Sequence, residues 1–561
     1  PIAAQLSPVW SSSSLGKPDT AKFRLTFVAD VPALGTNTYY VAKRSDQVQK
    51  SQVAVYGIES SEAGATFDVT YQKSPTSIGL ENDFVNLEID PATGLLNTAY
   101  LKDSSRTVEL QQGYHVYKTF RSGAYLFAPD SDAVPLAIGA PVIHLVKGNL
   151  FDEAAVFYSQ RAISFQVRLY KYQNRTQDKM LEITHNVDLT GSFSDEELVT
   201  RFSTNLQNNG VFYTDSNGID MQKRKYDVGC NIPCNYYPIT SSFVIQDEEA
   251  ENPVTLTVLT KQAFGASSLK NGQFEIMLDR RLQRDDGRGL GEGVTDNVAH
   301  SVTMWILLEQ LTSPRKIVDT PATYSMSLRL NHPLGVFYSK LTDVSSTYPS
   351  KHHLQLAPIS EGSIGKDLDV FGFKPRPSST EEVVLQLLNP SPTESLVADI
   401  PHLLSDFAIE SLQEYSLTLL HAKGSHSPLR FKPGSTKSYR LEPPSMYQNI
   451  EFPQADDEDM DPLSATIYVQ PKEIKTFVLR LKPSNFAPNT ETSEPARRMV
   501  PDKPAANSKP QAETVQVQQA QPSFPWLLFA VSAVMLSIII FQAFKQRAAN
   551  KFLKTTLPKT Q

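Results

Sequence analysis

The sequence predicts a mostly β protein built around a large antiparallel β-sandwich, flanked by smaller β domains and followed by one C-terminal transmembrane helix. Two observations predict the β body. Runs of alternating apolar and polar residues recur between Gly, Asn, Asp and Pro, and few stretches carry the 3.6-residue apolar period of a long helix. A third observation, an uncharged apolar run at 526–544, predicts the membrane helix.

Composition places the chain among ordinary globular proteins. Its 561 residues, 40% hydrophobic and 20% charged, are enough for about two to four domains with sizeable cores. The net charge of −7 and the lack of a basic stripe with interleaved aromatic residues argue against nucleic acid as a partner. Because the first residue is Pro and no signal-peptide pattern follows it, we expect a fragment or a processed product of a longer protein.

The first predicted domain covers residues 1–77 and is a small β domain. Alternating runs at 23–27 and 38–41 predict two strands, and the stretch 32–35, which contains Pro and Gly, predicts the turn between them. We therefore expect a short hairpin-like element ahead of the larger body.

The large β-sandwich is predicted at 78–325. An alternating run at 84–89 leads into the turn residues 90–94, which is the pattern of a hairpin. More strands follow, each bounded by Gly, Asn, Asp or Pro. They are predicted at 162–172, 181–189, 254–260, 274–282 and 302–308.

A terminal β domain is predicted at 326–483, and it ends in strands at 466–469 and 476–480. The acidic run at 456–461 in this domain is expected to be a solvated loop. It lacks the alternating ligand spacing and the Gly of a hand-type calcium loop.

The end of the chain predicts a membrane anchor. Residues 484–525 are rich in Pro, Gln, Thr, Ser and Ala and cannot bury enough apolar surface to become ordered, so we expect a disordered stalk. The uncharged run at 526–544 would be roughly 28 Å long as a helix, close to the hydrocarbon thickness of a bilayer. The tail at 545–561 is basic and has no acidic residue, which predicts a cytosolic tail and a lumenal β body.

A glycine-rich loop with a high density of charge follows the strand predicted at 274–282. Arg presents a rigid fork that carboxylates accept bidentately, so the loop predicts a network of charge-assisted hydrogen bonds. Two interpretations stay open, a buried structural network and a ligand-facing loop, because ion-pair networks are not diagnostic of function. The expected members are Arg280, Arg281, Arg284 and Arg288 with Asp279, Asp285, Asp286 and Glu292.

The same run resembles the C-terminal part of the class II α-mannosidases, glycoside hydrolase family 38. In that family a stretch of the form Arg-Arg-Leu…Asp-Asp-x-Arg-Gly-Leu reaches back to the active site. Similar motifs occur in order at 122–130, 212–218, 237–240 and 256–260. The resemblance covers roughly residues 1–330, is closer to Golgi than to lysosomal members, and implies a sandwich of the galactose mutarotase-like kind.

The resemblance implies a Golgi enzyme that hydrolyses α-mannosidic bonds in N-glycans with retention, through two carboxylates and a zinc ion. This chain contains neither a His-x-Asp-Pro-Gly-Trp motif nor a His-His-Asp run. The nucleophile and the zinc ligands are therefore expected in an N-terminal half, and no catalytic or metal-binding residue is predicted here. The alternative is a catalytically inactive lumenal membrane protein that binds carbohydrate or acts as a scaffold. A homodimer is compatible with both the enzyme and the inactive carbohydrate-binding protein.

Two substrate contacts are carried onto this chain by the resemblance. Tyr213 matches a tyrosine that hydrogen-bonds mannose hydroxyls, and Arg288 matches a loop arginine whose main chain lines the same pocket. Asp285 and Asp286 would support them as a network. A structural alternative for Tyr213 is a ring that caps the end of a strand.

A lumenal position draws attention to two further features. Asn174 begins the N-glycosylation sequon Asn-Arg-Thr, which follows a predicted strand. Cys230 and Cys234 would form either a local disulfide in an oxidising lumen or two free thiols.

Overall fold

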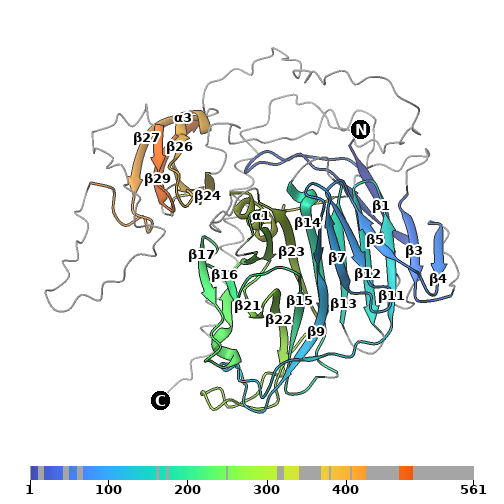
Figure 1. The fold of residues 1–561 in the computed structure, drawn as a ribbon. Helices are drawn as coiled ribbons and strands as arrows, with labels where there is room; N and C mark the ends of the chain where they lie inside the picture. The colour runs from blue at the N-terminus through green and yellow to red at the C-terminus, as the bar shows by residue number, and fades with distance from the viewer. Residues whose placement is uncertain are drawn as a thin grey trace, which may run out of the picture.

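The computed structural model is dominated by β-sheets, as the sequence predicts (Figure 1). It describes residues 2–10, 18–41, 50–59, 67–158, 163–171, 176–191, 193–247, 250–311, 321–339, 368–377, 379, 381–404, 407–424 and 466–483.

Two large sheets form the body. The six-stranded sheet has the order β10 (Val134–Pro135), β9 (Gln111–Lys118), β15 (Glu196–Ser203), β22 (Gln273–Arg281), β21 (Phe264–Lys270) and β18 (Tyr237–Ile239). The eleven-stranded sheet has the order β17 (Asp220–Lys225), β16 (Val211–Ser216), β19 (Ser242–Gln246), β20 (Val254–Thr260), β23 (His300–Gln310), β14 (Met180–Val187), β13 (Ile163–Tyr170), β12 (Phe151–Tyr158), β11 (Pro141–Lys147), β3 (Gln52–Tyr56) and β4 (Val69–Gln72).

Smaller sheets surround the body. They are a four-stranded sheet of β5 (Ile78–Glu81), β6 (Val85–Ile89), β7 (Leu96–Leu101) and β8 (Arg106–Glu109), and a hairpin of β1 (Ala4–Trp10) and β2 (Pro18–Phe27). The C-terminal ones are a four-stranded sheet of β24 (Asp369–Pro375), β25 (Glu382–Leu388), β29 (Ile474–Pro483) and β27 (Phe407–Tyr415), and a pair of β26 (Leu396–Asp399) and β28 (Thr466–Val469). The short helices are η1 (Thr176–Lys179), η2 (Ile232–Asn235), α1 (Pro321–Asn331) and α3 (Ile400–Leu403).

One apolar core, built from residues 78–308, joins the six-stranded sheet, the eleven-stranded sheet and the sheet of β5–β8. In β13, every second residue is buried, so one face of the strand packs inward and the other stays partly exposed. The inward side chains of the six-stranded, eleven-stranded and β5–β8 sheets form a single cluster, in which Phe202 stacks on Phe274 with ring centroids 5.0 Å apart. This packing confirms a sandwich of facing sheets.

The large sheet is not wholly antiparallel, because β3 and β4 pair in parallel at its edge. Both strands come from the predicted domain 1–77, so part of that segment completes the large sheet. The predicted hairpin at 84–94 is confirmed by β6 and β7, and the Asp90 carbonyl accepts from the Gly94 N–H at 2.7 Å.

The predicted strand at 38–41 is wrong, since these residues form no strand. The hydroxyl of Tyr39 donates to the carbonyl of Asp30 at 2.6 Å and accepts from the N–H of Asp30 at 2.7 Å. The turn at 32–35 does form, with a 2.9 Å bond from the Gly35 N–H to the Pro32 carbonyl. Side-chain hydrogen bonds thus replace a strand ladder here, and β2 pairs with β1.

The C-terminal sheets lie beside the body, at the upper left of Figure 1, and have their own apolar core. The predicted strands 466–469 and 476–480 are present as β28 and within β29, but they belong to different sheets. Helix α1, which the sequence pattern did not indicate, packs Met326 and Leu330 against the body.

Several predicted features fall outside the described residues. They are Asn174, the acidic run 456–461, the stalk 484–525, the apolar run 526–544 and the tail 545–561. Within the residues that the structure does describe, no helix is long and apolar enough to cross a bilayer.

The stacked pair Phe202 and Phe274 offers a test of the shared core. Truncating the fully buried Phe274 to Ala leaves a cavity between the sheets and is expected to lower the free energy of unfolding by about 3–5 kcal/mol. Phe337→Ala, at a phenylalanine that is 97% exposed, is the matched control and should change it by less than about 1 kcal/mol. Urea unfolding followed by fluorescence measures both, and equal effects would contradict a shared core.

Candidate functional site

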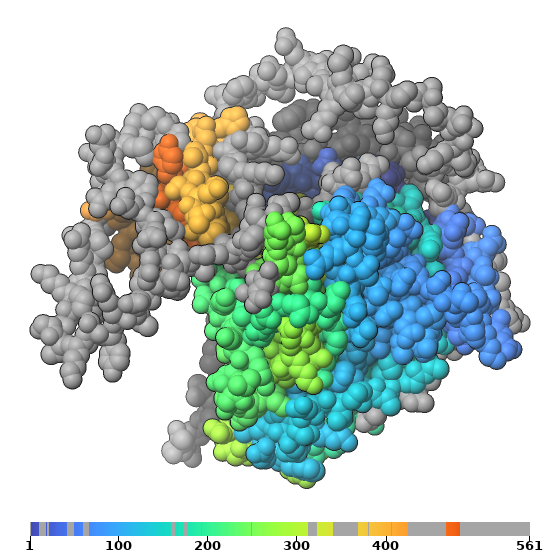
Figure 2. All heavy atoms as spheres, in the orientation of Figure 1, coloured from blue at the N-terminus to red at the C-terminus, as the bar shows by residue number. Residues whose placement is uncertain are grey.

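The charged loop leaves β22 at one end of the sandwich, next to the loop 119–130 that follows β9. In Figure 2 the yellow-green atoms of residues near 290 lie at the lower end of the molecule, beside blue atoms from the first third of the chain. Hydrogen bonds from the N–H groups of Tyr125 and Leu126 to the Asp286 carboxylate connect these two loops.

Asp286 holds the loops together through backbone donors. One carboxylate oxygen accepts from the N–H groups of Tyr125 at 2.8 Å and Leu126 at 3.0 Å, and the other accepts from the N–H of Arg288 at 3.1 Å. Partial burial acts to raise the pKa of Asp286, but the three N–H donors and the Arg288 charge outweigh it and keep this pKa below its usual value.

The lack of a side chain at Gly123 allows Asp286 to approach the loop 119–130 this closely. A Cβ at position 123 would lie 2.5 Å from the Cβ of Asp286 and 2.6 Å from its backbone nitrogen. Both distances are too short for real atoms, so any side chain at 123 would push the charged loop away.

Arg280 adds a second connection between the loops. Its guanidinium donates to the carbonyls of Gly123 at 2.5 Å and Leu126 at 2.8 Å, and it lies 2.7 Å from a carboxylate oxygen of Glu197. Arg280 and Glu197 are register partners in β22 and β15. Burial raises the pKa of Glu197 to about 7, although Arg280 and the hydroxyl of Ser122 act to lower it.

Three of the four arginines of the predicted network have their closest partners outside the predicted carboxylates. Arg280 pairs with Glu197 of the neighbouring strand, Arg284 lies 3.7 Å from Asp195, and Arg281 donates to the carbonyl of Thr295 at 2.8 Å. The loop carboxylates accept mainly from backbone and amide groups: Asp285 from the N–H of Gly291 at 3.3 Å, and Asp279 from the side chain of Asn297 at 3.1 Å. For Arg280, the cross-strand neighbour decides the ion pair rather than nearness in sequence.

Tyr213 lies in β16, on the eleven-stranded sheet, whereas Arg288 follows the six-stranded sheet. The Tyr213 side chain packs with Val211, Met221 and Val244, and it is only 7% exposed. Its ring is also 6.0 Å from the ammonium group of Lys223. Arg288 is exposed, and its main chain is fixed by Asp286.

Asp215 is a residue whose role the sequence reasoning missed. Its carboxylate is 5% exposed and accepts from the N–H groups of Gly218 at 2.8 Å, Thr240 at 2.8 Å and Ser242 at 3.0 Å. It joins the turn after β16 to the start of β19. The signal was present in the Asp-Ser-Asn-Gly pattern, which is typical of a turn closed by an Asp side chain.

A disulfide joins Cys230 to Cys234, with the Cα atoms 6.2 Å apart. It lies in the loop around η2, where Asn235 accepts from the N–H of Asp227 at 2.8 Å and donates to its carbonyl at 3.1 Å. Across the described part of the chain, no three His, Cys, Asp or Glu side chains are grouped closely enough to hold a metal ion.

Comparison with known families identifies two segments. Residues 80–288 match the family described as "Glycosyl hydrolases family 38 C-terminal domain". Residues 2–41 match the one described as "Lysosomal alpha-mannosidase-like, central domain". The first match contains most strands of the sandwich, Tyr213 and the first part of the charged loop.

Curated relatives extend the similarity. "Alpha-mannosidase 2" of Arabidopsis thaliana is 30% identical over an alignment of 511 positions that covers 86% of this chain and 42% of that protein. The human protein of the same name is 28% identical over 79% of this chain and 40% of its own length. The chain thus spans about two fifths of these relatives. A solved α-mannosidase from Enterococcus faecalis V583 aligns over 74% of this chain and 44% of its own, with a TM-score of 0.46 and 12% identity.

The loop anchor can be tested by proteolysis. Replacing Asp286 with Ala removes the acceptor for three backbone N–H groups, so trypsin should cleave after Arg284 and Arg288 several-fold faster. Asp285→Ala is the matched control, because Asp285 accepts one bond at 3.3 Å. Mass spectrometry of the fragments over time measures both rates, and similar rates in the two variants would refute the anchor.

The buried carboxyl of Glu197 predicts a pH-dependent stability. Its folded pKa of about 7 lies above the ordinary 4.5, so the stability it contributes is complete below pH 4.5 and is lost as pH rises through 7. Glu197→Gln cannot ionise and should match the parent near pH 5 but exceed its free energy of unfolding at pH 8 by up to about 3 kcal/mol.

Denaturant unfolding of parent and variant at pH 5 and pH 8 provides the measurement. Glu109→Gln, at an exposed side chain, controls for the loss of one negative charge. A parent that is more stable than Glu197→Gln at pH 8 would mean that the ion pair with Arg280 outweighs the cost of burial.

Proposed function

Since this chain belongs to glycoside hydrolase family 38 through its C-terminal domain, we propose that it is the C-terminal portion of an enzyme that hydrolyses α-mannosidic bonds during N-glycan processing. The observation that carries the proposal is the family match over 80–288, together with similarity to α-mannosidase 2 proteins over most of the chain. The catalytic carboxylates are assigned to the part of such an enzyme that lies outside this sequence.

The role proposed for this portion is to line the substrate pocket. The anchored loop supports this role, because Asp286 fixes the main chain of Arg288 against residues 125–126. A pocket wall of this kind must keep its shape while a polar ligand replaces water, and backbone groups held by a carboxylate do so at little entropic cost. The hydroxyl of Tyr213, on β16 next to the edge strand β17, is proposed to donate to a mannose hydroxyl.

Zinc enters the proposal through the resemblance alone. The ion would grip the hydroxyl groups of the bound sugar. The described residues do not fit a zinc site, because they contain no group of three or more possible ligands. We therefore assign zinc no ligand in this chain.

The proposed location is the Golgi membrane, with a single span at 526–544, the β body in the lumen and the tail 545–561 in the cytosol. The apolar run and the basic tail support this topology. The sandwich is proposed to be of the galactose mutarotase-like kind, and the ligands are proposed to be mannose-containing N-glycans.

The native mass tests the proposal. An antibody against residues 1–320 should detect a membrane protein well above 62.3 kDa in cell extract, and immunoprecipitates should release mannose from a chromogenic α-mannoside. A species near the calculated mass without this activity would favour the inactive carbohydrate-binding protein instead.

In the complete enzyme, Tyr213→Phe is expected to lower kcat/KM for an oligomannose substrate by about 2- to 10-fold, the worth of one neutral hydrogen bond. The ring and its packing with Met221 and Val244 remain in this variant. Tyr100→Phe, at an exposed tyrosine on β7, is the matched control. An unchanged kcat/KM in Tyr213→Phe would exclude the proposed contact.

A further inference from the structure

The outer face of the eleven-stranded sheet carries a regular arrangement of polar side chains. Strands β13, β14 and β23 lie side by side in the interior of this sheet, and their inward residues belong to the core. Their outward residues stand in register across the three strands. The rows are Ser164–Asn186–Ser301, Gln166–Thr184–Thr303 and Arg168–Glu182–Trp305, and we call them together the polar ladder.

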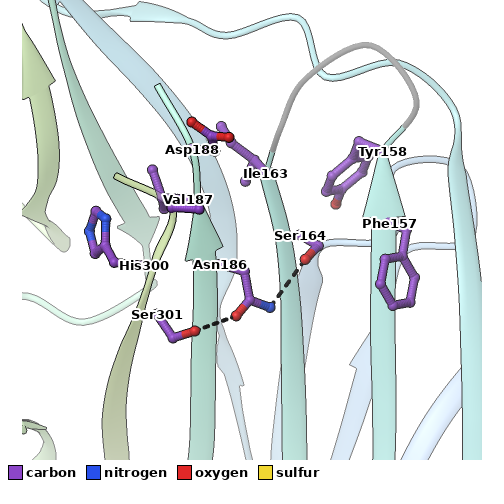
Figure 3. A pocket seen from close by; sticks show the side chains of 10 residues that line it. Phe157, Tyr158, Ile163, Ser164, Asn186, Val187, Asp188, His300 and Ser301 are labelled. Atoms are coloured by element: carbon purple, nitrogen blue, oxygen red, sulfur yellow. Dashed lines mark hydrogen bonds between the residues drawn. The ribbon is translucent and has the colours of Figure 1, made fainter. Parts of the chain in front are cut away.

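Hydrogen bonds connect side chains within the ladder. In the first row, the hydroxyl of Ser301 donates to the amide oxygen of Asn186 at 2.7 Å, and the Asn186 amide donates to the Ser164 hydroxyl at 3.1 Å (Figure 3). In the second row, the hydroxyls of Thr184 and Thr303 are 3.1 Å apart. These bonds preset the side chains, so a ligand would meet donors and acceptors that are already oriented.

The third row is held by Glu182. One of its carboxylate oxygens accepts from the indole N–H of Trp305 at 3.0 Å, and the other accepts from the guanidinium of Arg168 at 3.0 Å. This row therefore fixes an aromatic side chain beside the two rows of hydroxyl and amide groups.

A hollow opens at each end of the ladder. The first has a volume of about 410 Å³ and is lined by the first row together with Phe157 and His300, as Figure 3 shows. The second has a volume of about 390 Å³ and is lined by Glu182 and Trp305 together with Tyr170 and Phe27. First and third rows are four residues apart, so they are separated by roughly 14 Å. The arrangement suits an extended ligand with several polar units.

The charges around the third row cancel. Arg168 lies 2.5 Å from Glu153 and 3.0 Å from Glu182, and Arg24 lies 3.5 Å from Glu153. Two cations and two anions thus neutralise one another at the third row, and the carboxylate of Asp188 in the first hollow is the remaining charge. The other groups left for a ligand are hydroxyls, an amide, the imidazole of His300 and aromatic rings. A neutral ligand fits this surface better than a phosphate, an acidic peptide or a nucleic acid.

The fold also disfavours a protein ligand here. A peptide that adds to a sheet needs an unpaired strand edge, and all three strands of the ladder are paired on both sides. An amphipathic helix needs an apolar groove, whereas the first two rows are polar along their length. A sugar chain offers what the ladder can use, namely hydroxyls for its polar rows and a C–H face for an aromatic ring.

We propose that the polar ladder and its two hollows form a binding site for a neutral oligosaccharide, separate from the pocket wall built by the charged loop. The first two rows hydrogen-bond hydroxyl groups, and the hollow beside Trp305 and Tyr170 takes a sugar ring. The site needs no catalytic group, so it would act in this chain alone and hold a glycan while another branch is processed elsewhere. Only this last role rests on the proposed function.

The test is calorimetric titration of the full chain with an α-linked mannotriose, and with maltotriose as a second neutral trisaccharide. The double variant Asn186→Ala/Ser301→Ala removes both hydrogen bonds of the first row at exposed side chains, so the fold should persist. Affinity for the mannotriose should fall by about tenfold. The matched control is Thr98→Ala, which removes a similar bond, Thr98 to Glu88 at 2.8 Å, from a different sheet and should leave affinity unchanged.

Each outcome either supports or overturns the proposed oligosaccharide site. Stronger binding of mannotriose than of maltotriose names the sugar class, and equal binding keeps the site but makes it general for neutral oligosaccharides. Saturable binding that Asn186→Ala/Ser301→Ala leaves intact overturns the site, and so does the absence of binding by both sugars while circular dichroism shows a folded chain. Loss of mannosidase activity in the complete enzyme would leave these titrations unchanged, so the two proposals fail separately.

Discussion

The apolar core between the six-stranded and eleven-stranded sheets is the constraint on which the other features depend. Successive side chains of a strand point to opposite faces of the sheet. Each Phe or Leu that packs in the core therefore sets the direction of the two residues next to it in the strand. The strand ends are fixed as well, and these ends carry both the turn closed by Asp215 and the loop closed by Asp286. The positions of the side chains in this turn and this loop therefore depend on the packing of the core.

Three carboxylates fix loops or make the stability of this region depend on pH. Asp215 and Asp286 accept from backbone N–H groups far away in sequence, while Glu197 is buried beside Arg280 and titrates near neutrality. The first two fix loops without needing a charged partner. The third couples the stability of the same region to pH, because its ionised form is the one that burial disfavours.

The sequence pattern predicts strands well where apolar and polar residues alternate along the run. Alternation places 254–260 and 466–469 with the bounds that the structure has, but it misplaces 38–41, where the Tyr39 hydroxyl holds the chain instead of a neighbouring strand. Family motifs indicate the charged loop and Tyr213. The anchor of that loop escapes prediction, since Asp286 and Tyr125 are 161 residues apart and only the register of the sheets brings them together.

The contact between Gly123 and Asp286 determines how mutations at position 123 would act. It touches no proposed ligand, yet the space its missing side chain leaves is occupied by Asp286, which in turn fixes Arg288. A genetic screen would thus score position 123 as part of the pocket, and a second change near 286 would be the natural suppressor. Mutations in these two loops, which are far apart in the sequence, would therefore have coupled effects.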